Sequence, residues 1–166
     1  MKKNGFTLVE LMIVVTILGI LAAIVIPEFQ GHASESRESA VKSSLHTVRS
    51  QIELYNMQHE SDLGYIGTMP ATGVYVGTQL TGTSAANGSA QASKTPNGTY
   101  PHGPYLMGMP KNPYNNLNTI KIVGAAVTDY STQVDDTTGW LFQKETGTFK
   151  VNSSGTDSDS VAYVDY

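Results

Sequence analysis

One acidic side chain stands in the most apolar stretch of the chain. Between Phe6 and Ile26 only Thr7, Glu10 and Thr16 are polar. A carboxylate at the centre of a membrane span costs about 2.5–3.5 kcal/mol on insertion scales, so Glu10 must be compensated or lie near an edge. A cation on a neighbouring molecule could pair with it, and such a pair would fix the alignment of the two molecules. The alternative is that Glu10 reaches the lipid headgroups and stays solvated.

A second group of side chains could bind a metal ion. Residues 154–160 read Ser-Gly-Thr-Asp-Ser-Asp-Ser. Calcium takes six to eight oxygen ligands from carboxylates, carbonyls and hydroxyls. The run lacks the spacing of an EF-hand loop, which needs further acids and a glycine. The sequence therefore leaves two alternatives: a solvated turn, or a calcium site with Asp157 and Asp159 as ligands.

No pattern typical of an enzyme is present. There is no zinc-protease motif, no glycine-rich phosphate loop and no nucleophile elbow. Asp135 and Asp136 precede two threonines and indicate a turn rather than an acid–base pair. The histidines are scattered along the chain: His32, His46, His59 and His102. We therefore expect no catalytic activity.

The apolar stretch is long enough to cross a membrane. Its 21 residues form about 31 Å of helix at 1.5 Å per residue, against a hydrocarbon core of about 30 Å. Lys2 and Lys3 precede it, as expected on the cytoplasmic side. A secretory signal would end in a small-residue cleavage site, whereas here more apolar residues follow, up to Pro27.

These residues resemble the N-terminus of the type IV pilin superfamily, which includes the pseudopilins of type II secretion. The matching string is Lys-Lys-Asn-Gly at residues 2–5, followed by FTLVELMIVVTILGILAAIVIP. The resemblance implies that a prepilin peptidase cuts after Gly5 and methylates the new N-terminal Phe6. Glu10 then matches the fifth residue of the mature chain. This context favours its pairing with the terminal amine of a neighbouring subunit.

The resemblance also implies a function and its partners. A structural subunit of a type IV pilus-like filament is expected, most simply a major pseudopilin that helps to drive protein export. A type IV pilin for adhesion, motility or DNA uptake is the alternative, and a monomeric membrane-anchored binding module is a third. The partners would be further copies of the chain, the prepilin peptidase, and the assembly platform and ATPase of the inner membrane. The subunit would wait in the bacterial inner membrane and end in a periplasmic or cell-surface filament.

The composition of the chain narrows the possible classes of protein further. The formal charge is −4, and loss of Lys2 and Lys3 with the leader makes the mature chain more acidic by two. An acidic chain without a basic stripe is not typical of nucleic-acid binders. Cysteine is absent, so the disulfide that closes many pilins cannot form. Calcium in the C-terminal loop, which the resemblance also implies, could take its place.

The rest of the chain predicts an α+β, pilin-like fold. We expect a leader at residues 1–5, a membrane helix at 6–27, an amphipathic helix at 28–62 and a variable loop and sheet region at 63–166. Gly19 and Pro27 should kink or break the helix, and the resemblance implies local unwinding there in filaments. Apolar residues then recur at helical spacing and form one seam: Val41, Leu45, Val48, Ile52 and Tyr55.

A small antiparallel sheet should cover that seam. Strands are expected at residues 119–123, 139–143 and 148–151, with the last two joined by a turn at 144–147. Their apolar side chains are Trp140, Phe142, Phe149 and Val151. Residues 74–76 indicate a further short strand, and residues 85–94 a flexible exposed loop.

Two short motifs remain. Residues 109–114 read Met-Pro-Lys-Asn-Pro-Tyr, which is similar to the proline-bounded loop after the helix of major pseudopilins. By itself it predicts a turn pinned by prolines. Asn87, Asn97 and Asn152 begin glycosylation acceptor patterns, although such matches arise by chance in a chain rich in Asn, Ser and Thr.

Overall fold

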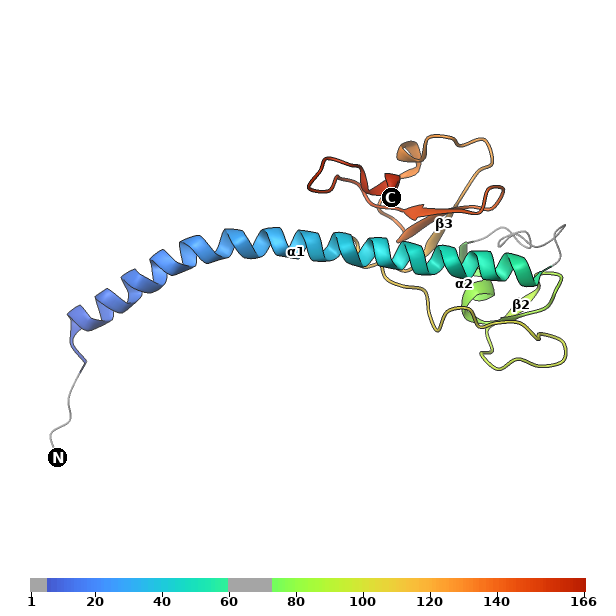
Figure 1. Cartoon of the computed structure of the whole chain (residues 1–166), viewed down its shortest axis with the longest axis horizontal. Helices are drawn as coiled ribbons and strands as arrows, with labels where there is room; N and C mark the ends of the chain where they lie inside the picture. The colour runs from blue at the N-terminus through green and yellow to red at the C-terminus, as the bar shows by residue number, and fades with distance from the viewer. Residues whose placement is uncertain (1–5, 60–72) are drawn as a thin grey trace, which may run out of the picture. The chain divides into compact units, whose positions relative to one another are not determined.

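The computed structural model describes residues 6–59 and 73–166, apart from the side chains of 27–31 and 73–74. Gly5 and the expected helix end near residues 62–64 lie outside the described residues. Two compact units are present, Met1–Ser36 and Arg37–Tyr166; the second is called the head below. The elements run in the order α1 (Leu8–Gln58), α2 (Gly73–Thr81), β1 (Thr83–Ser84), β2 (Ala90–Gln91), β3 (Ile120–Val123), η1 (Tyr130–Gln133), β4 (Trp140–Gln143), β5 (Thr148–Val151) and η2 (Tyr163–Asp165) (Figure 1).

Helix α1 is continuous over 51 residues and passes through Gly19 and Pro27 without a break. The predicted break is therefore not seen in the single chain. A proline removes one backbone hydrogen bond, and the helix-forming residues on both sides are enough to carry the helix past it. Unwinding in a filament stays a prediction.

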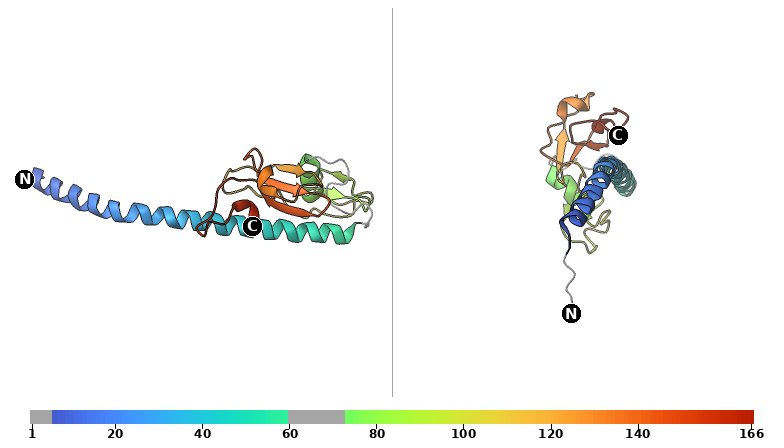
Figure 2. Two further views of the ribbon diagram at one scale, coloured as in Figure 1. Left: turned by 90° about the horizontal axis from the view of Figure 1, so that it is seen from above. Right: turned by 90° about the vertical axis from the view of Figure 1, so that its left-hand side faces the viewer.

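The predicted seam of α1 forms the core of the head. Val41, Leu45, Val48, Ile52 and Tyr55 are at most 1% exposed. They pack in one cluster with the strand side chains Trp140, Phe142, Phe149 and Val151, and Figure 2 shows these strands lying along the helix. Each fully buried apolar side chain contributes about 1.5–3 kcal/mol, so this contact stabilises the head.

The sheet has the order β3-β4-β5. The β4–β5 pair is antiparallel, as predicted, and its register places Phe142 opposite Phe149. Gly147 has a φ of +69° in the connecting turn, which glycine adopts without strain. In contrast, β3 pairs with β4 in parallel, because the 16 residues between them cross back over the sheet before β4 begins.

The prediction of a strand at residues 74–76 is wrong, because these residues lie in α2. Val76 and Leu80 are both fully buried, and their separation of four residues is a helical repeat. The segment predicted as an exposed loop at 85–94 is also more ordered than expected. It contains β2, which pairs antiparallel with β1, and Gly88 within it is buried.

The motif at residues 109–114 is a loop organised by a buried asparagine. Asn112 is 0% exposed and its side chain donates to Gly139 O at 2.9 Å while accepting from Tyr114 N at 2.9 Å. The carbonyl of Pro110 accepts a hydrogen bond from the indole of Trp140 at 2.9 Å. The loop therefore fastens the chain to the end of β4, beyond what a proline-pinned turn requires.

Candidate processing and assembly site

The predicted cleavage point lies at the edge of the described chain. Phe6 is the first described residue, and its side chain is 80% exposed. Helix α1 begins two residues later, at Leu8.

Glu10 closes the first turn of α1 together with Thr7. Its Oε2 accepts hydrogen bonds from Thr7 N at 2.9 Å and Thr7 Oγ1 at 2.7 Å, and Glu10 N donates to Thr7 Oγ1 at 3.2 Å. This reciprocal arrangement is a capping box, which satisfies backbone donors that have no partner within the helix. In a single chain the carboxylate is therefore at the helix start, bound to two local donors.

The Thr-x-x-Glu pattern is visible in the sequence, but our sequence analysis did not use it. It explains how an acid is tolerated here without a second molecule, because its local hydrogen bonds offset part of the burial penalty. The helix start also carries a positive partial charge that favours an anion. These hydrogen bonds satisfy the carboxylate in the single chain, and both alternatives for Glu10, solvation at the headgroups and pairing with a neighbouring amine, stay predictions.

The segment after Glu10 exposes apolar side chains on every side. Leu8–Ile26 is a candidate membrane span of 19 residues with a mean hydropathy of 2.9, and none of it is buried. The polar Thr16 hydroxyl donates to Met12 O at 2.7 Å, which satisfies it inside the helix. A helix that is apolar all round must be covered by lipid or by other protein. This unit therefore requires a membrane or partner molecules.

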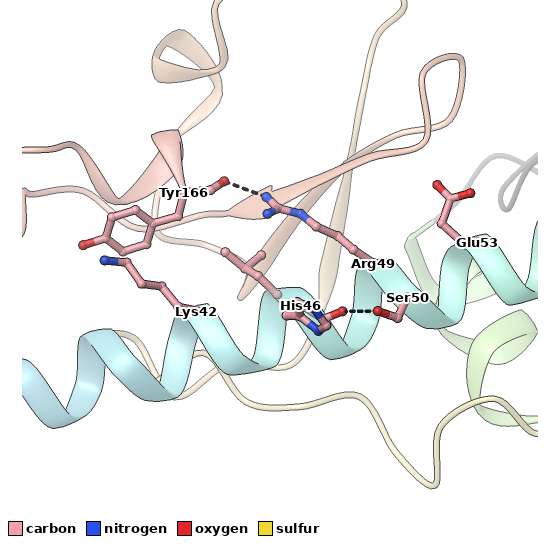
Figure 3. A pocket seen from close by; sticks show the side chains of 7 residues that line it. Lys42, His46, Arg49, Ser50, Glu53 and Tyr166 are labelled. Atoms are coloured by element: carbon pink, nitrogen blue, oxygen red, sulfur yellow. Dashed lines mark hydrogen bonds between the residues drawn. The ribbon is translucent and has the colours of Figure 1, made fainter.

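Within the head, Arg49 of α1 binds strand β5 and the C-terminal segment to the helix (Figure 3). The guanidinium donates through Nε and one terminal nitrogen to Phe149 O at 3.0 and 2.8 Å, and to Tyr166 O at 2.6 Å. Lys42 lies 4.5 Å from the centre of the Tyr166 ring. Two cations of α1 thus hold strand β5 and the C-terminal segment.

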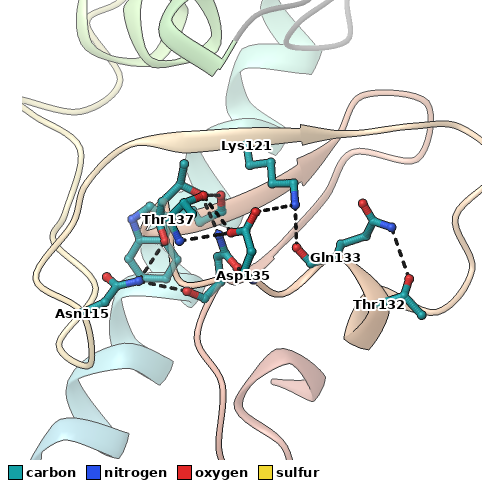
Figure 4. Close-up of polar contacts among 9 residues, drawn as sticks. Asn115, Lys121, Thr132, Gln133, Asp135 and Thr137 are labelled. Atoms are coloured by element: carbon teal, nitrogen blue, oxygen red, sulfur yellow. Dashed lines mark hydrogen bonds and ion pairs between the residues drawn. The ribbon is translucent and has the colours of Figure 1, made fainter.

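A polar network closes the loop before β4 (Figure 4). Asp135 accepts from Lys121 at 2.8 Å and from the Asn152 amide at 2.8 Å, and Asn115 donates to the carbonyls of Thr138 and Asn152. The hydrogen bond from Lys121 is the largest cause that lowers the pKa of Asp135, and the hydrogen bond from Asn152 is the next. Asp135 is thus the centre of a turn, as predicted, and is held ionised.

Asp157 organises the C-terminal loop by accepting hydrogen bonds. Its Oδ1 accepts from the backbone N–H groups of Asp159 and Val161 at 2.9 and 2.8 Å, and its Oδ2 accepts from the Tyr166 hydroxyl at 2.7 Å. The Tyr166 hydroxyl lowers the pKa of Asp157, and these N–H groups act in the same direction.

Asp157 accepts three hydrogen bonds through its two carboxylate oxygens, so a metal ion would compete with these donors for the carboxylate. Within residues 6–59 and 73–166, no three acidic or histidine side chains converge on a point where an ion could sit. The loop is closed by Asp157 and Tyr166 themselves, and calcium at Asp157 and Asp159 stays a prediction.

Among the four histidines, His59 and His102 come together, with ring centroids 5.2 Å apart. His32 and His46 are exposed on α1, whereas His59 is buried. Among the acceptor patterns for glycosylation, Asn152 is fully buried, so an enzyme could not reach it in the folded head. Arg49 and Asn112 hold the head together, and neither could be recognised from the sequence because their partners are backbone carbonyls distant along the chain.

An exposed apolar helix that begins with a capped acid, followed by a compact α+β head, is consistent with a pilin-like fold. Residues 1–26 match the family model of the prokaryotic N-terminal methylation motif. The resemblance to the type IV pilin superfamily is therefore confirmed for the N-terminal segment.

Curated relatives include proteins of both branches. The chain is 41% identical over 93 residues to a type IV major fimbrial protein FimA of Dichelobacter nodosus, covering 53% of this chain and 58% of the relative. It is 31% identical over 77 residues to the type II secretion system core protein G of Dickeya chrysanthemi, covering 43% and 50%. It is 26% identical over 115 residues to the core protein G of Klebsiella pneumoniae, covering 69% and 71%.

These matches are partial in both branches, since the chain spans 58% and 33% of two fimbrial relatives and 50% and 41% of two core proteins G. No solved structure matches the chain significantly.

Proposed function

We propose that this chain is a structural subunit of a type IV pilus-like filament, of the pseudopilus kind found in type II secretion systems. The supporting observation is the contrast between its two units. The head buries its apolar side chains, whereas the large apolar side chains of Leu8–Ile26 are about half or more exposed. Such a helix is stable in a membrane as a monomer and, once extracted, only when other copies surround it.

The proposed life of the subunit follows from that helix. The prepilin peptidase removes Met1 to Gly5 and methylates Phe6 while the subunit stands in the bacterial inner membrane. The assembly platform and its ATPase then transfer it into a periplasmic or surface filament. The chemistry is performed by those partners, and the subunit itself supplies binding surfaces.

Glu10 sets the alignment of neighbouring subunits in this proposal. In the single chain its carboxylate is satisfied by Thr7. Cleavage creates a positive amine at Phe6, and in an assembled core the amine of one subunit would pair with Glu10 of another. Since an unpaired buried charge is costly, only the register that joins the two charges is favourable. Gly19 and Pro27 would allow α1 to unwind locally in the packed filament.

The secretion role is preferred over a pilus. The match to the Klebsiella core protein G extends over 115 residues, so it must include part of the head as well as α1, which has 51 residues. The fimbrial relatives are more identical over shorter stretches, which keeps the pilin for adhesion, motility or DNA uptake as the second candidate.

Deletion of the gene, followed by complementation, tests the choice. A pseudopilin predicts that secreted proteins accumulate in the periplasm while surface pili persist. Loss of surface pili with normal secretion would favour the pilin, and a normal result for both would favour a monomeric anchored module. Complementation with Glu10→Val should fail although the variant is inserted and processed. Thr16→Val is the matched control, because it removes a polar group from the same span without removing a charge.

A further inference from the structure

His59, which follows the last turn of α1, is a buried ionisable group that filament assembly does not use. It is 5% exposed, and its ring stacks on that of Tyr55 with centroids 3.7 Å apart and planes at 12°. Nδ1 lies 2.7 Å from Tyr55 O, and Nε2 lies 3.0 Å from Ser84 Oγ in β1. One imidazole therefore joins the end of α1 to the β1–β2 hairpin.

The partners of His59 define its neutral form. Tyr55 O is a carbonyl and can only accept, so Nδ1 carries the proton. Nε2 is then the acceptor for the hydroxyl of Ser84. Protonation would turn Nε2 from an acceptor into a donor. Ser84 Oγ, which donates to the neutral ring, would then face a second donor. The existing hydrogen bond has to be lost or reversed when His59 becomes charged.

A second histidine shares the same bridge. Ser84 N donates to His102 O at 2.9 Å and His102 N donates to Ser84 O at 3.0 Å. The two imidazole rings have centroids 5.2 Å apart. A charge on one ring therefore opposes a charge on the other, and His102 pairs with Ser84, the residue of β1 that His59 contacts.

Among the described residues, no acidic side chain contacts His59 to compensate the positive charge of its protonated form. The ionisable side chains near His59 are Tyr55 of α1, and His102 and Tyr105 of the loop that follows β2; Tyr75 of α2 joins the same cluster through Gly88 O. Burial raises the pKa of Tyr55 and Tyr105, so both stay neutral near pH 7. Burial is the largest cause that lowers the pKa of His59, and the nearby His102 adds to it, whereas hydrogen bonding to the backbone of Tyr55 and of Ala85 opposes it.

Further hydrogen bonds join the hairpin to α1 and to α2. Gly88 O accepts from the Gln79 amide at 2.8 Å and from the Tyr55 hydroxyl at 3.4 Å. Tyr105 donates to Gln58 at 2.8 Å.

We propose that His59 is a pH-sensitive latch that holds the β1–β2 hairpin and the His102 segment on α1 when neutral and releases them when protonated. The inference does not depend on the proposed function. It would make this end of the head respond to acidification of its surroundings, while the β3–β5 sheet stays packed.

The size of the response follows from linkage. The pKa of His59 is lowered in the closed form and returns to its ordinary value of 6.5 when the latch opens. The open form thus binds more protons, so the closed form loses stability as pH falls below 6.5. Between pH 7.5 and 5.5, the opening equilibrium rises by up to about tenfold.

Hydrogen exchange of the full chain in detergent micelles, measured by mass spectrometry at pH 7.5 and 5.5, tests this proposal. After correction for the intrinsic effect of pH on exchange, residues 82–91 and 100–105 should open up to about tenfold more at pH 5.5. Residues 140–151 should be unchanged. His59→Gln should lose most of this response, and His46→Gln, which changes an exposed histidine of the same helix, should keep it.

The same response in His59→Gln as in the unmodified chain would overturn the proposal. Should that variant fail to fold, an NMR titration of the unmodified protein gives the answer. His59 should then titrate below its ordinary value of 6.5, whereas a midpoint at or above that value would overturn the latch.

Discussion

Replacement of Arg49 by methionine should loosen the head without disturbing the membrane helix. Methionine keeps much of the aliphatic packing of arginine but removes every N–H that reaches Phe149 O and Tyr166 O. The two donors to Phe149 O share one acceptor and count as one contact, so two carbonyls lose a charged donor. Hydrogen bonds to charged groups contribute about 1.5–3 kcal/mol each, and Arg49 is half-buried, so we expect a loss of about 2–3 kcal/mol.

Urea unfolding in detergent micelles, followed by tryptophan fluorescence, measures this loss. The chain has a single tryptophan, and Trp140 is fully buried in the core of the head, so the signal reports on the head alone. For a domain of this size the midpoint should fall by about 1 M urea. Arg49→Lys should lose less, because lysine keeps a charged donor, and Arg37→Met on the exposed surface should change nothing. A change below about 0.5 kcal/mol for Arg49→Met would refute the role of this clamp.

Three further predictions concern the polar contacts of the head. Asn112→Ala should destabilise the head by about 1–3 kcal/mol, because Gly139 O loses its buried donor; an unchanged unfolding midpoint would contradict the loop's role. The pKa of Asp135 is lowered in the folded state, so its contribution is present above its ordinary value of 3.8 and is lost as pH falls further. The Tm of Asp135→Asn should therefore fall less steeply at the acid end, between pH 7 and 2, than the Tm of the unmodified chain. Parallel pH profiles of the two Tm values would argue against this role of Asp135. Asp157→Asn should lower the Tm by weakening the loop closure by Tyr166. The unmodified Tm should be the same in millimolar calcium and in chelator if this closure is sufficient, whereas a rise in calcium that Asp157→Ala with Asp159→Ala abolishes would establish the metal site.

The seam of α1 could be predicted because burial there follows a simple period. Five apolar residues at spacings of three and four, from Val41 to Tyr55, specify one face of a helix. Alternation of apolar residues likewise located β4 and β5, and the bulky side chains Trp140 and Phe149 were sufficient to indicate which face covers the helix.

Short segments could not be assigned in the same way. Three apolar residues at 74–76 fit a strand or a turn of helix equally well, and the decisive partner, Leu80, lies outside that run. The parallel pairing of β3 also has no local signal, because it depends on where the chain returns after residue 123 rather than on the residues within the strand.

The contacts that fix the head were hidden for a different reason. Arg49 and Asn112 bind backbone carbonyls, which every residue possesses, so their partners leave no trace in the sequence. Asp157 had the right chemistry for a metal ligand, but N–H and O–H donors within the same loop occupy its carboxylate. The capping box of Thr7 and Glu10 is the contrary case, since its four-residue pattern was present and would have predicted the contact.

The most direct test of filament assembly is the N-terminus of the assembled subunit. Filaments sheared or purified from cells that contain the prepilin peptidase should yield, by mass spectrometry, a chain that begins at methylated Phe6. Subunits with Glu10→Val should be processed in the same way but be absent from the filament fraction. A filament subunit that retains Met1 to Gly5, or processed Glu10→Val that assembles as well as the unmodified chain, would contradict the account.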